Sequence, residues 1–169
     1  MNYLILWFLI VLQRVVELFF ARRNERWMKK RGAKVIDENL YTWMVRTHVV
    51  FLLAILFEAY TRHQFTAPLQ ESLILLFVLL QAGRVWCIFS LGRFWNTKIV
   101  VLPGSKQVKR GPYKWISHPN YIVVGLEFLF IPLLFHAYIC ACLFPILHLA
   151  LMSIRIPMEE KTLKALTKD

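Results

Sequence analysis

Two short segments of the sequence carry side chains that could bind a charged ligand, and the first is Ser117-His118-Pro119-Asn120-Tyr121. Proline fits the first position of a helix, because its missing N–H would have no partner there. We therefore expect a helix to begin at Pro119, with His118 as its capping residue. The free N–H groups of such a helix start favour oxyanions and hydroxyls. His118 and Tyr121 are three residues apart and would flank that spot on one face.

The second segment is Arg155-Ile156-Pro157-Met158-Glu159-Glu160-Lys161-Thr162-Leu163. Pro157 again predicts a helix start, which would put Glu159 and Glu160 in the first turn, where carboxylates are favourable. Arg155 and Glu159 are four residues apart, so they either converge on a ligand or form a surface ion pair of little energy. Both segments directly adjoin long apolar stretches. This shared placement favours a common binding site.

The helices that must position these segments are expected to cross a membrane. Of the 169 residues, 58% are hydrophobic and 18% are charged. A water-soluble domain typically has about 45–50% apolar and about 25% charged residues. The net charge of +11 would otherwise suggest nucleic acid, but nucleic-acid-binding proteins are rarely so apolar, and we expect no nucleic-acid partner. Intrinsic disorder is excluded by the same composition.

The apolar stretches predict about five transmembrane helices. A spanning helix needs roughly 20 mainly apolar residues. Three stretches meet this requirement: Tyr3–Phe20, Trp43–Tyr60 and Leu69–Leu91. Tyr121–Ile154 is too long for one span, and Pro132 with a turn at His136-Ala137-Tyr138 predicts a tight hairpin of two short spans. The expected fold is an all-α polytopic integral membrane protein, with residues 1–169 in a single membrane domain.

The positions of the basic residues predict the orientation of the chain. Seventeen of the 21 lysines and arginines lie between spans one and two, between spans three and four, or after span five, and Arg62 alone lies on the other side. Loops rich in Lys and Arg stay in the cytoplasm. We therefore expect a cell-membrane protein with its N-terminus outside, and with its C-terminus and both candidate segments on the cytoplasmic side. The stretch Arg22–Lys34 is expected to continue the first helix along the interface and to contact anionic lipids.

Several ionisable residues lie inside the expected spans, where such groups are costly and usually face a cavity or each other. They are Arg14, Glu17, Arg46, Arg84 and Glu127. We interpret Glu127 as a buried partner of an arginine, near or under the substrate pocket. Arg14 and Arg84 either take part in such pairing or extend to the interface. Neither the cysteines nor the remaining histidines have the spacing of metal ligands, so we expect no metal.

Both segments resemble motifs of the isoprenylcysteine carboxyl methyltransferase family of integral-membrane enzymes. The residues that carry the resemblance are Gly111-Pro112-Tyr113, His118-Pro119-Asn120-Tyr121, and Arg155, Glu159, Glu160 and Leu163. The resemblance covers roughly residues 92–166. The stretches Phe94-Trp95-Asn96-Thr97 and Leu102-Pro103-Gly104 are similar to a short bacterial branch. Some members of that branch are functionally linked to type III polyketide synthases and O-methylate alkylpyrones or related phenolic lipids.

The resemblance implies that residues 1–91 supply three N-terminal spans, while residues 92–169 supply a cofactor-binding loop, a helical hairpin and a C-terminal helix. S-adenosylmethionine would enter from the cytosol, and a lipophilic substrate would enter sideways from the bilayer. Arg155 and Glu159 would be the catalytic residues, and the substrate would contact Arg155 and Glu127. The implied cofactor contacts are Ser105, Lys106, Gln107, Val108, Tyr113, His118, Pro119, Asn120, Tyr121, Glu159 and Glu160.

The sequence leaves alternatives for the identity of the methyl acceptor and for the class of reaction. Many relatives have an arginine immediately before His-Pro, where this chain has Ser117. An acceptor whose carboxylate would be held by two arginines of the enzyme, such as an isoprenylcysteine, is then less favoured. A lipid with a small acidic enol or phenol would need less. The alternative functions are a phospholipid N-methyltransferase, a membrane NADPH-dependent reductase, and a small scaffold without enzymatic activity. The reductase class usually has a longer C-terminal tail that contains tyrosines.

Overall fold

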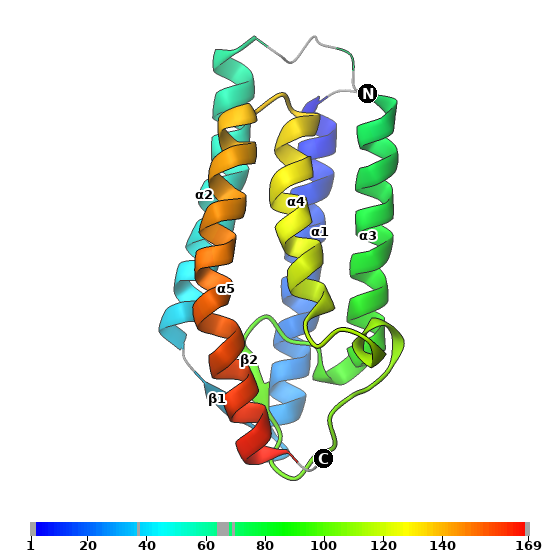
Figure 1. Cartoon of the computed structure of the whole chain (residues 1–169), viewed down its shortest axis with the longest axis vertical. Helices are drawn as coiled ribbons and strands as arrows, with labels where there is room; N and C mark the ends of the chain where they lie inside the picture. Colours follow the sequence, from blue (N-terminus) through cyan, green and yellow to red (C-terminus); the bar gives the residue numbers. More distant parts are fainter. Residues whose placement is uncertain (1–2, 37, 64–67, 69, 168–169) are drawn as a thin grey trace.

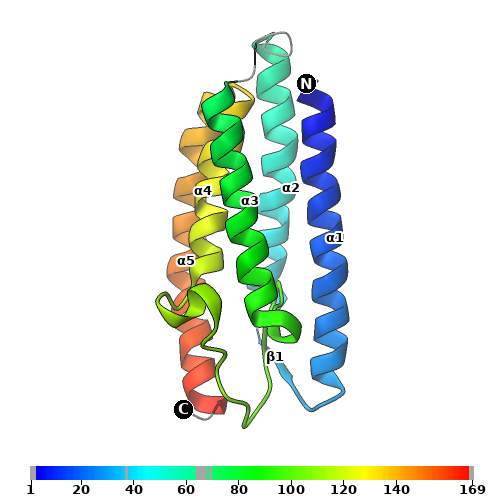
Figure 2. The ribbon, with the colours of Figure 1, turned by 90° about the vertical axis from the view of Figure 1, so that its right-hand side faces the viewer.

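Five helices form an elongated antiparallel bundle in the computed structural model, which describes residues 3–36, 38–63, 68 and 70–167 (Figures 1 and 2). The helices are α1 (Tyr3–Lys29), α2 (Glu38–Thr61), α3 (Glu71–Leu91), α4 (Pro119–Leu134) and α5 (Tyr138–Leu166). Two 3₁₀ turns, η2 (Gly92–Phe94) and η3 (Gly111–Lys114), and two strands, β1 (Lys34–Ile36) and β2 (Ile99–Val101), lie between them. We call the end of the bundle that holds β1, β2 and the last turn of α5 the sheet end.

The helices have the length and the surface of a multi-pass membrane protein. α1, α2, α3 and α5 are each long and apolar enough to span a bilayer, and α4 is a shorter apolar helix of 16 residues. Large side chains remain exposed on the outside of the bundle, for example Phe57 at 71% and Phe89 at 80%. A surface of this kind is stable when lipid rather than water surrounds it. The all-α polytopic fold expected from the sequence is confirmed, with the small sheet as an addition.

The predicted hairpin between the last two spans is present at Phe135–Ala137. His136 has a positive φ of 54°, and the N–H of Ala137 donates to the carbonyl of Pro132 at 2.9 Å. Glu58 of α2 accepts hydrogen bonds from the backbone N–H groups of Ile139 and Cys140, each at 2.9 Å. This carboxylate therefore caps the start of α5 from a neighbouring helix.

The expectation that Pro157 begins a new helix is wrong. α5 runs without a break from Tyr138 to Leu166 and contains both Pro145 and Pro157. A proline inside a helix removes one backbone hydrogen bond, but apolar helices in membranes tolerate it where packing and nearby polar groups compensate. As a result, Arg155 and Glu159 lie one turn apart on one continuous helix.

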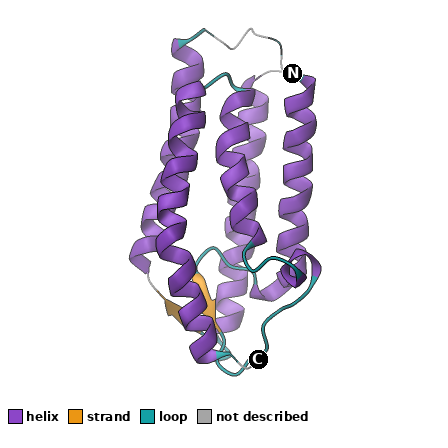
Figure 3. Cartoon of the chain, in the orientation of Figure 1, coloured by secondary structure: helices purple, strands orange, loops and turns teal. Residues whose placement is uncertain are grey.

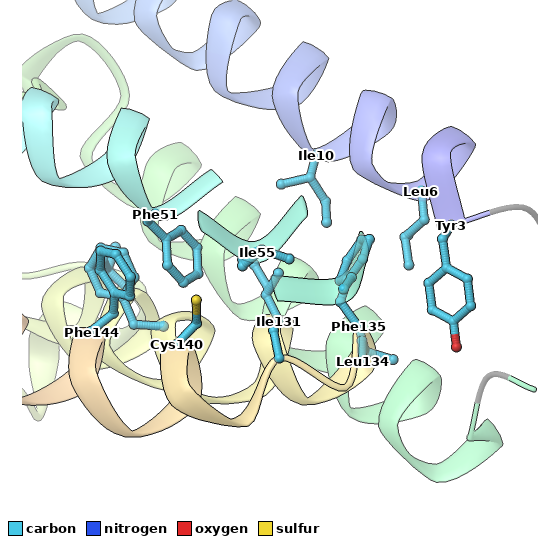
Figure 4. Close-up of a cluster of buried hydrophobic side chains, with 14 residues drawn as sticks. Tyr3, Leu6, Ile10, Phe51, Ile55, Ile131, Leu134, Phe135, Cys140 and Phe144 are labelled. Atoms are coloured by element: carbon cyan, nitrogen blue, oxygen red, sulfur yellow. The ribbon is translucent and has the colours of Figure 1, made fainter. Parts of the chain in front are cut away.

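The apolar core lies in the half of the bundle away from the sheet end (Figure 4). Figure 4 shows side chains of α1, α2, α4 and α5 pointing toward one another, among them Ile10, Phe51, Ile131 and Phe144. α4 packs mainly against α3 and α5, so the shortest helix is also well enclosed. This packing fixes the start of α4, and with it the first candidate segment.

The two short strands tie together distant parts of the chain at the sheet end. They pair antiparallel, with Lys34 opposite Val101 and Ile36 opposite Ile99. The β-branched run of residues 99–101 suits a strand. The sequence of its partner, in the connection between α1 and α2, gives little indication of a strand. Figure 3 shows the sheet beside the end of α5, with the long loop of residues 92–118 folded around it.

Candidate active site

A cavity at the sheet end collects most of the residues expected to form the site. It lies between the loop of residues 92–118, the start of α4 and the last turns of α5. The expected residues that line it are Ser105, Lys106, Gln107, Val108, Tyr113, His118, Asn120, Tyr121, Arg155 and Glu159. Pro119, Glu160 and Glu127 are not part of this lining.

Tyr121 connects the two segments that the sequence singled out. The Nε of Arg155 donates to the hydroxyl of Tyr121 at 2.7 Å, and that hydroxyl donates in turn to Oε2 of Glu159. The guanidinium carbon of Arg155 also lies 5.4 Å from the centre of the Tyr121 ring. Arg155 and Glu159 thus converge on Tyr121, and no direct ion pair joins them in the part of the chain that the structure describes.

Arg155 is a buried cation whose hydrogen-bond partners are uncharged. Its side chain is 3% exposed. Besides Tyr121, it donates to the sulfur of Met44 at 2.8 Å and to the carbonyl of Thr97 at 2.8 Å. Among the described residues it makes no salt bridge. Because a buried charge is costly without a counter-charge, this arginine is well placed to bind an anionic oxygen in the cavity.

His118 occupies the expected position before α4. It is the capping residue of a helix that begins at Pro119, and its ring stacks on Tyr121 with centroids 5.3 Å apart. Its Nε2 lies 3.3 Å from Oε1 of Glu160, and its Nδ1 lies 4.0 Å from Oε2 of Glu159. Glu160 therefore holds His118 from outside the cavity, while Glu159 faces inward.

The long loop is fastened to the end of α5. The N–H of Gly104 donates to the carbonyl of Leu166 at 2.8 Å, and Gln107 donates to the hydroxyl of Thr167 at 3.3 Å. Tyr113 lies in η3, which is part of this loop and precedes α4. Burial raises the pKa of its hydroxyl above the ordinary value, so the group stays protonated at neutral pH. The loop thus presents the neutral hydroxyl of Tyr113 to the cavity beside the charged Lys106.

Two buried polar atoms of the cavity lining lack a partner among the described residues. They are the indole Nε1 of Trp95, whose side chain is 2% exposed, and the carbonyl oxygen Oδ1 of Asn120. One is a donor and the other an acceptor. Buried polar groups usually have a hydrogen-bond partner, so this donor and this acceptor are available to a ligand in the cavity.

Sequence reasoning missed several residues that build the cavity. The β2 strand, Trp95, Asn96 and Leu163 line it, and Met44 of α2 bonds Arg155. His148, which the motifs did not indicate, lies 3.0 Å through Nε2 from the carbonyl of Tyr121 and so ties α5 to the start of α4. Trp95, Asn96 and Leu163 belonged to stretches that carried the family resemblance, but they were not predicted as site residues.

Glu127 lies in a buried ion-pair cluster in the middle of the bundle. Its carboxylate is 2.9 Å from Arg14 Nη2 and 2.8 Å from Arg84 Nη1. Glu17 completes the cluster with a bidentate contact to Arg84 at 2.6 Å for both oxygens. The interpretation of Glu127 as a partner of an arginine is therefore confirmed. Arg46 is not in the cluster, since it is exposed and lies 5.4 Å from the ring of Trp43.

Comparisons with known proteins agree with the motifs. Residues 73–165 match the sequence profile of the isoprenylcysteine carboxyl methyltransferase (ICMT) family. An uncharacterized protein of Bacillus subtilis, YpbQ, is 41% identical over 156 residues, which cover 92% of this chain and 93% of that protein. An uncharacterized protein of Haemophilus influenzae is 27% identical over 90% of each chain. No solved structure gives a significant match.

Proposed function

This chain belongs to the isoprenylcysteine carboxyl methyltransferase family, and from that premise we propose that it uses S-adenosylmethionine to methylate an oxygen of a lipophilic acceptor. Membership makes it a membrane methyltransferase of this type. The observation that carries the proposal is the buried link from Arg155 through Tyr121 to Glu159 at the wall of one cavity. A binding site for both a cationic cofactor and an anionic acceptor needs such separated charges of opposite sign.

The residues at the cavity fit S-adenosylmethionine. The unpartnered Oδ1 of Asn120 and Nε1 of Trp95 supply one acceptor and one donor for an adenine base or an amino-acid group. The Glu159 carboxylate suits an ammonium group or ribose hydroxyls, and the start of α4 suits a carboxylate. Ser105, Lys106, Gln107, Val108 and Tyr113 line the same cavity from the loop. When bound, the cofactor would supply a methyl group on a positively charged sulfur.

We assign to Arg155 the binding of the methyl acceptor. Its buried guanidinium would attract and orient an anionic oxygen, because its present partners do not neutralise it. An acidic enol such as a hydroxypyrone is already largely ionised near neutral pH and needs no strong general base. Methyl transfer is an in-line displacement, so alignment of the acceptor is the main contribution of these residues. A positive site favours this acceptor over an amine, which places phospholipid N-methylation second.

The site would work at the cytoplasmic face of the cell membrane. The basic ends of α1 and α5 and the loop of residues 92–118 all lie at the sheet end (Figure 1), and loops rich in lysine and arginine stay in the cytoplasm. Lys168, which was counted among these basic residues, lies outside the described part of the chain. The lipophilic acceptor, such as an alkylpyrone made by a type III polyketide synthase, would arrive through the bilayer.

Cofactor binding by the purified protein tests the proposal. Titration of S-adenosylmethionine is expected to give a saturable heat signal in detergent, and Glu159→Gln should weaken binding by about tenfold, since a charge-assisted hydrogen bond contributes roughly 1.5–3 kcal/mol. Glu71→Gln is the control, because this carboxylate is exposed at the start of α3 and lies outside the cavity. Absence of binding to the wild-type protein would contradict the proposal.

A further inference from the structure

A second cavity lies at the sheet end, where α1 meets η2, and it does not share its basic residues with the candidate active site. Its wall includes the ring of Trp27 and five basic side chains, those of Arg22, Arg23, Arg26, Lys30 and Arg93. Steps of four residues align Arg22, Arg26 and Lys30 along one side of α1. Arg93 comes from η2, far away in the sequence. The cavity is therefore built by two elements.

The two elements are fixed against each other. The side-chain amide of Asn24 donates to the carbonyls of Gly92 at 3.1 Å and Trp95 at 2.8 Å. The rings of Trp27 and Phe94 meet edge to face at 6.1 Å. These contacts hold Arg93 over Trp27, with its guanidinium carbon 5.2 Å from the ring centre. The basic groups thus surround a defined space.

The positive charge of this cavity is not balanced by the described part of the protein. None of the five basic side chains of the wall makes a salt bridge there. The nearest carboxylate in the sequence, Glu25, is engaged by Lys29 at 2.6 Å and Lys98 at 3.6 Å. The indole Nε1 of Trp27 is buried and lacks an acceptor among the described residues. Five exposed basic side chains beside an unused donor are suited to an anion with several oxygens.

The position of the cavity indicates where that anion comes from. Phe19, 66% exposed, belongs to both the cavity wall and the apolar outer face of α1. The basic residues follow directly after this face, at the level where lipid headgroups meet water. We propose that the cavity binds the phosphate headgroup of an anionic phospholipid of the surrounding membrane, with the acyl chains against the apolar face that contains Phe19.

Lipid retention by the purified protein tests this site. The protein is mixed in detergent with phosphatidylglycerol or phosphatidylcholine, and bound lipid is counted by native mass spectrometry. We expect phosphatidylglycerol to bind at least about tenfold more tightly than phosphatidylcholine, because each basic residue near a charged membrane surface adds substantially to binding. The triple variant Arg23→Gln, Arg26→Gln, Arg93→Gln should lose this preference.

A matched triple variant separates the cavity from general electrostatic attraction. Arg46→Gln, Lys161→Gln, Lys164→Gln removes the same charge from residues outside this cavity and should keep the preference. Equal loss in both triple variants, or equal binding in the cavity variant and the wild type, would overturn the proposal. Inorganic phosphate is titrated alone in the same way. Binding of phosphate as tight as that of phosphatidylglycerol would overturn the lipid assignment. If the cavity variant does not fold, Arg93→Gln alone is measured against Arg46→Gln with the same criteria.

Discussion

At the scale of single residues, the hydroxyl of Tyr121 sets the direction of the central hydrogen-bond chain. It has one proton, which it gives to Glu159, so it can only accept from Arg155. The tyrosine therefore keeps a cation and a carboxylate close together without direct contact. Each charged group retains capacity for a ligand of the opposite sign, which a direct salt bridge would have consumed.

Removal of this hydroxyl should affect turnover more than folding. In Tyr121→Phe, Arg155 and Glu159 each lose a charge-assisted hydrogen bond that contributes roughly 1.5–3 kcal/mol, so we expect turnover to fall about 10–100-fold. Initial rates with labelled S-adenosylmethionine measure the effect. The control is Tyr60→Phe, because Tyr60 is exposed and lies near the end of α2 that is away from the sheet end. Unchanged turnover in Tyr121→Phe would show that the link is not used.

At the scale of elements, predictions from sequence succeeded where one local signal was sufficient. The start of α4 at Pro119 and the hairpin after Pro132 follow from proline and apolar pattern alone. The helix start at Pro157 failed because packing within the bundle outweighs the local preference of proline. The β1–β2 pair and the hydrogen bond that Arg155 donates to Met44 join segments far apart in sequence, so no local pattern could indicate them.

The close packing of η3 against α3 makes Gly111 sensitive to substitution. Gly111 and Gly92 both have φ of 54°, so an alanine at either position carries similar backbone strain, of order 1 kcal/mol. A Cβ at Gly111 would also collide with the hydroxyl of Ser90 and crowd the indole of Trp86, whereas a Cβ at Gly92 would meet nothing within 4 Å. We expect Gly111→Ala to displace the loop that carries Tyr113.

Comparison of the two alanine variants isolates this collision. Gly111→Ala should weaken S-adenosylmethionine binding by at least about tenfold, equivalent to roughly 1.4 kcal/mol, while Gly92→Ala should bind nearly as the wild type does. Cofactor titration in detergent measures both. Equal affinities would mean that η3 yields to the added methyl group without moving the cavity wall.

At the scale of the whole molecule, the ion-pair cluster joins three helices across the middle of the bundle. It links Arg14 and Glu17 of α1 to Arg84 of α3 and Glu127 of α4. Sequence alone indicated that these residues need partners, because charged groups in a membrane interior are costly. It did not indicate which residues pair, because that depends on how the helices pack. The cluster also leaves Arg46 outside, exposed at the surface.

Neutralising Glu127 should destabilise the bundle. Glu127→Gln leaves two arginines against one carboxylate, and breaking a buried ion pair typically costs about 3–5 kcal/mol. We expect a clearly lower Tm in detergent, with Glu71→Gln, an exposed residue at the start of α3, changing stability by less than about 0.5 kcal/mol. A substrate contact by Glu127 would instead raise KM for the acceptor and leave Tm unchanged.

The composition of the same cluster has an electrical consequence. Its two arginines and two glutamates sum to zero charge, so a transmembrane voltage exerts no net force on it, whereas a single unbalanced charge would feel about 2.3 kcal/mol per 100 mV. The helices at this depth are therefore held together by charges that cancel as a group. The cluster thus joins three helices without adding a net charge on which a change in membrane voltage could act.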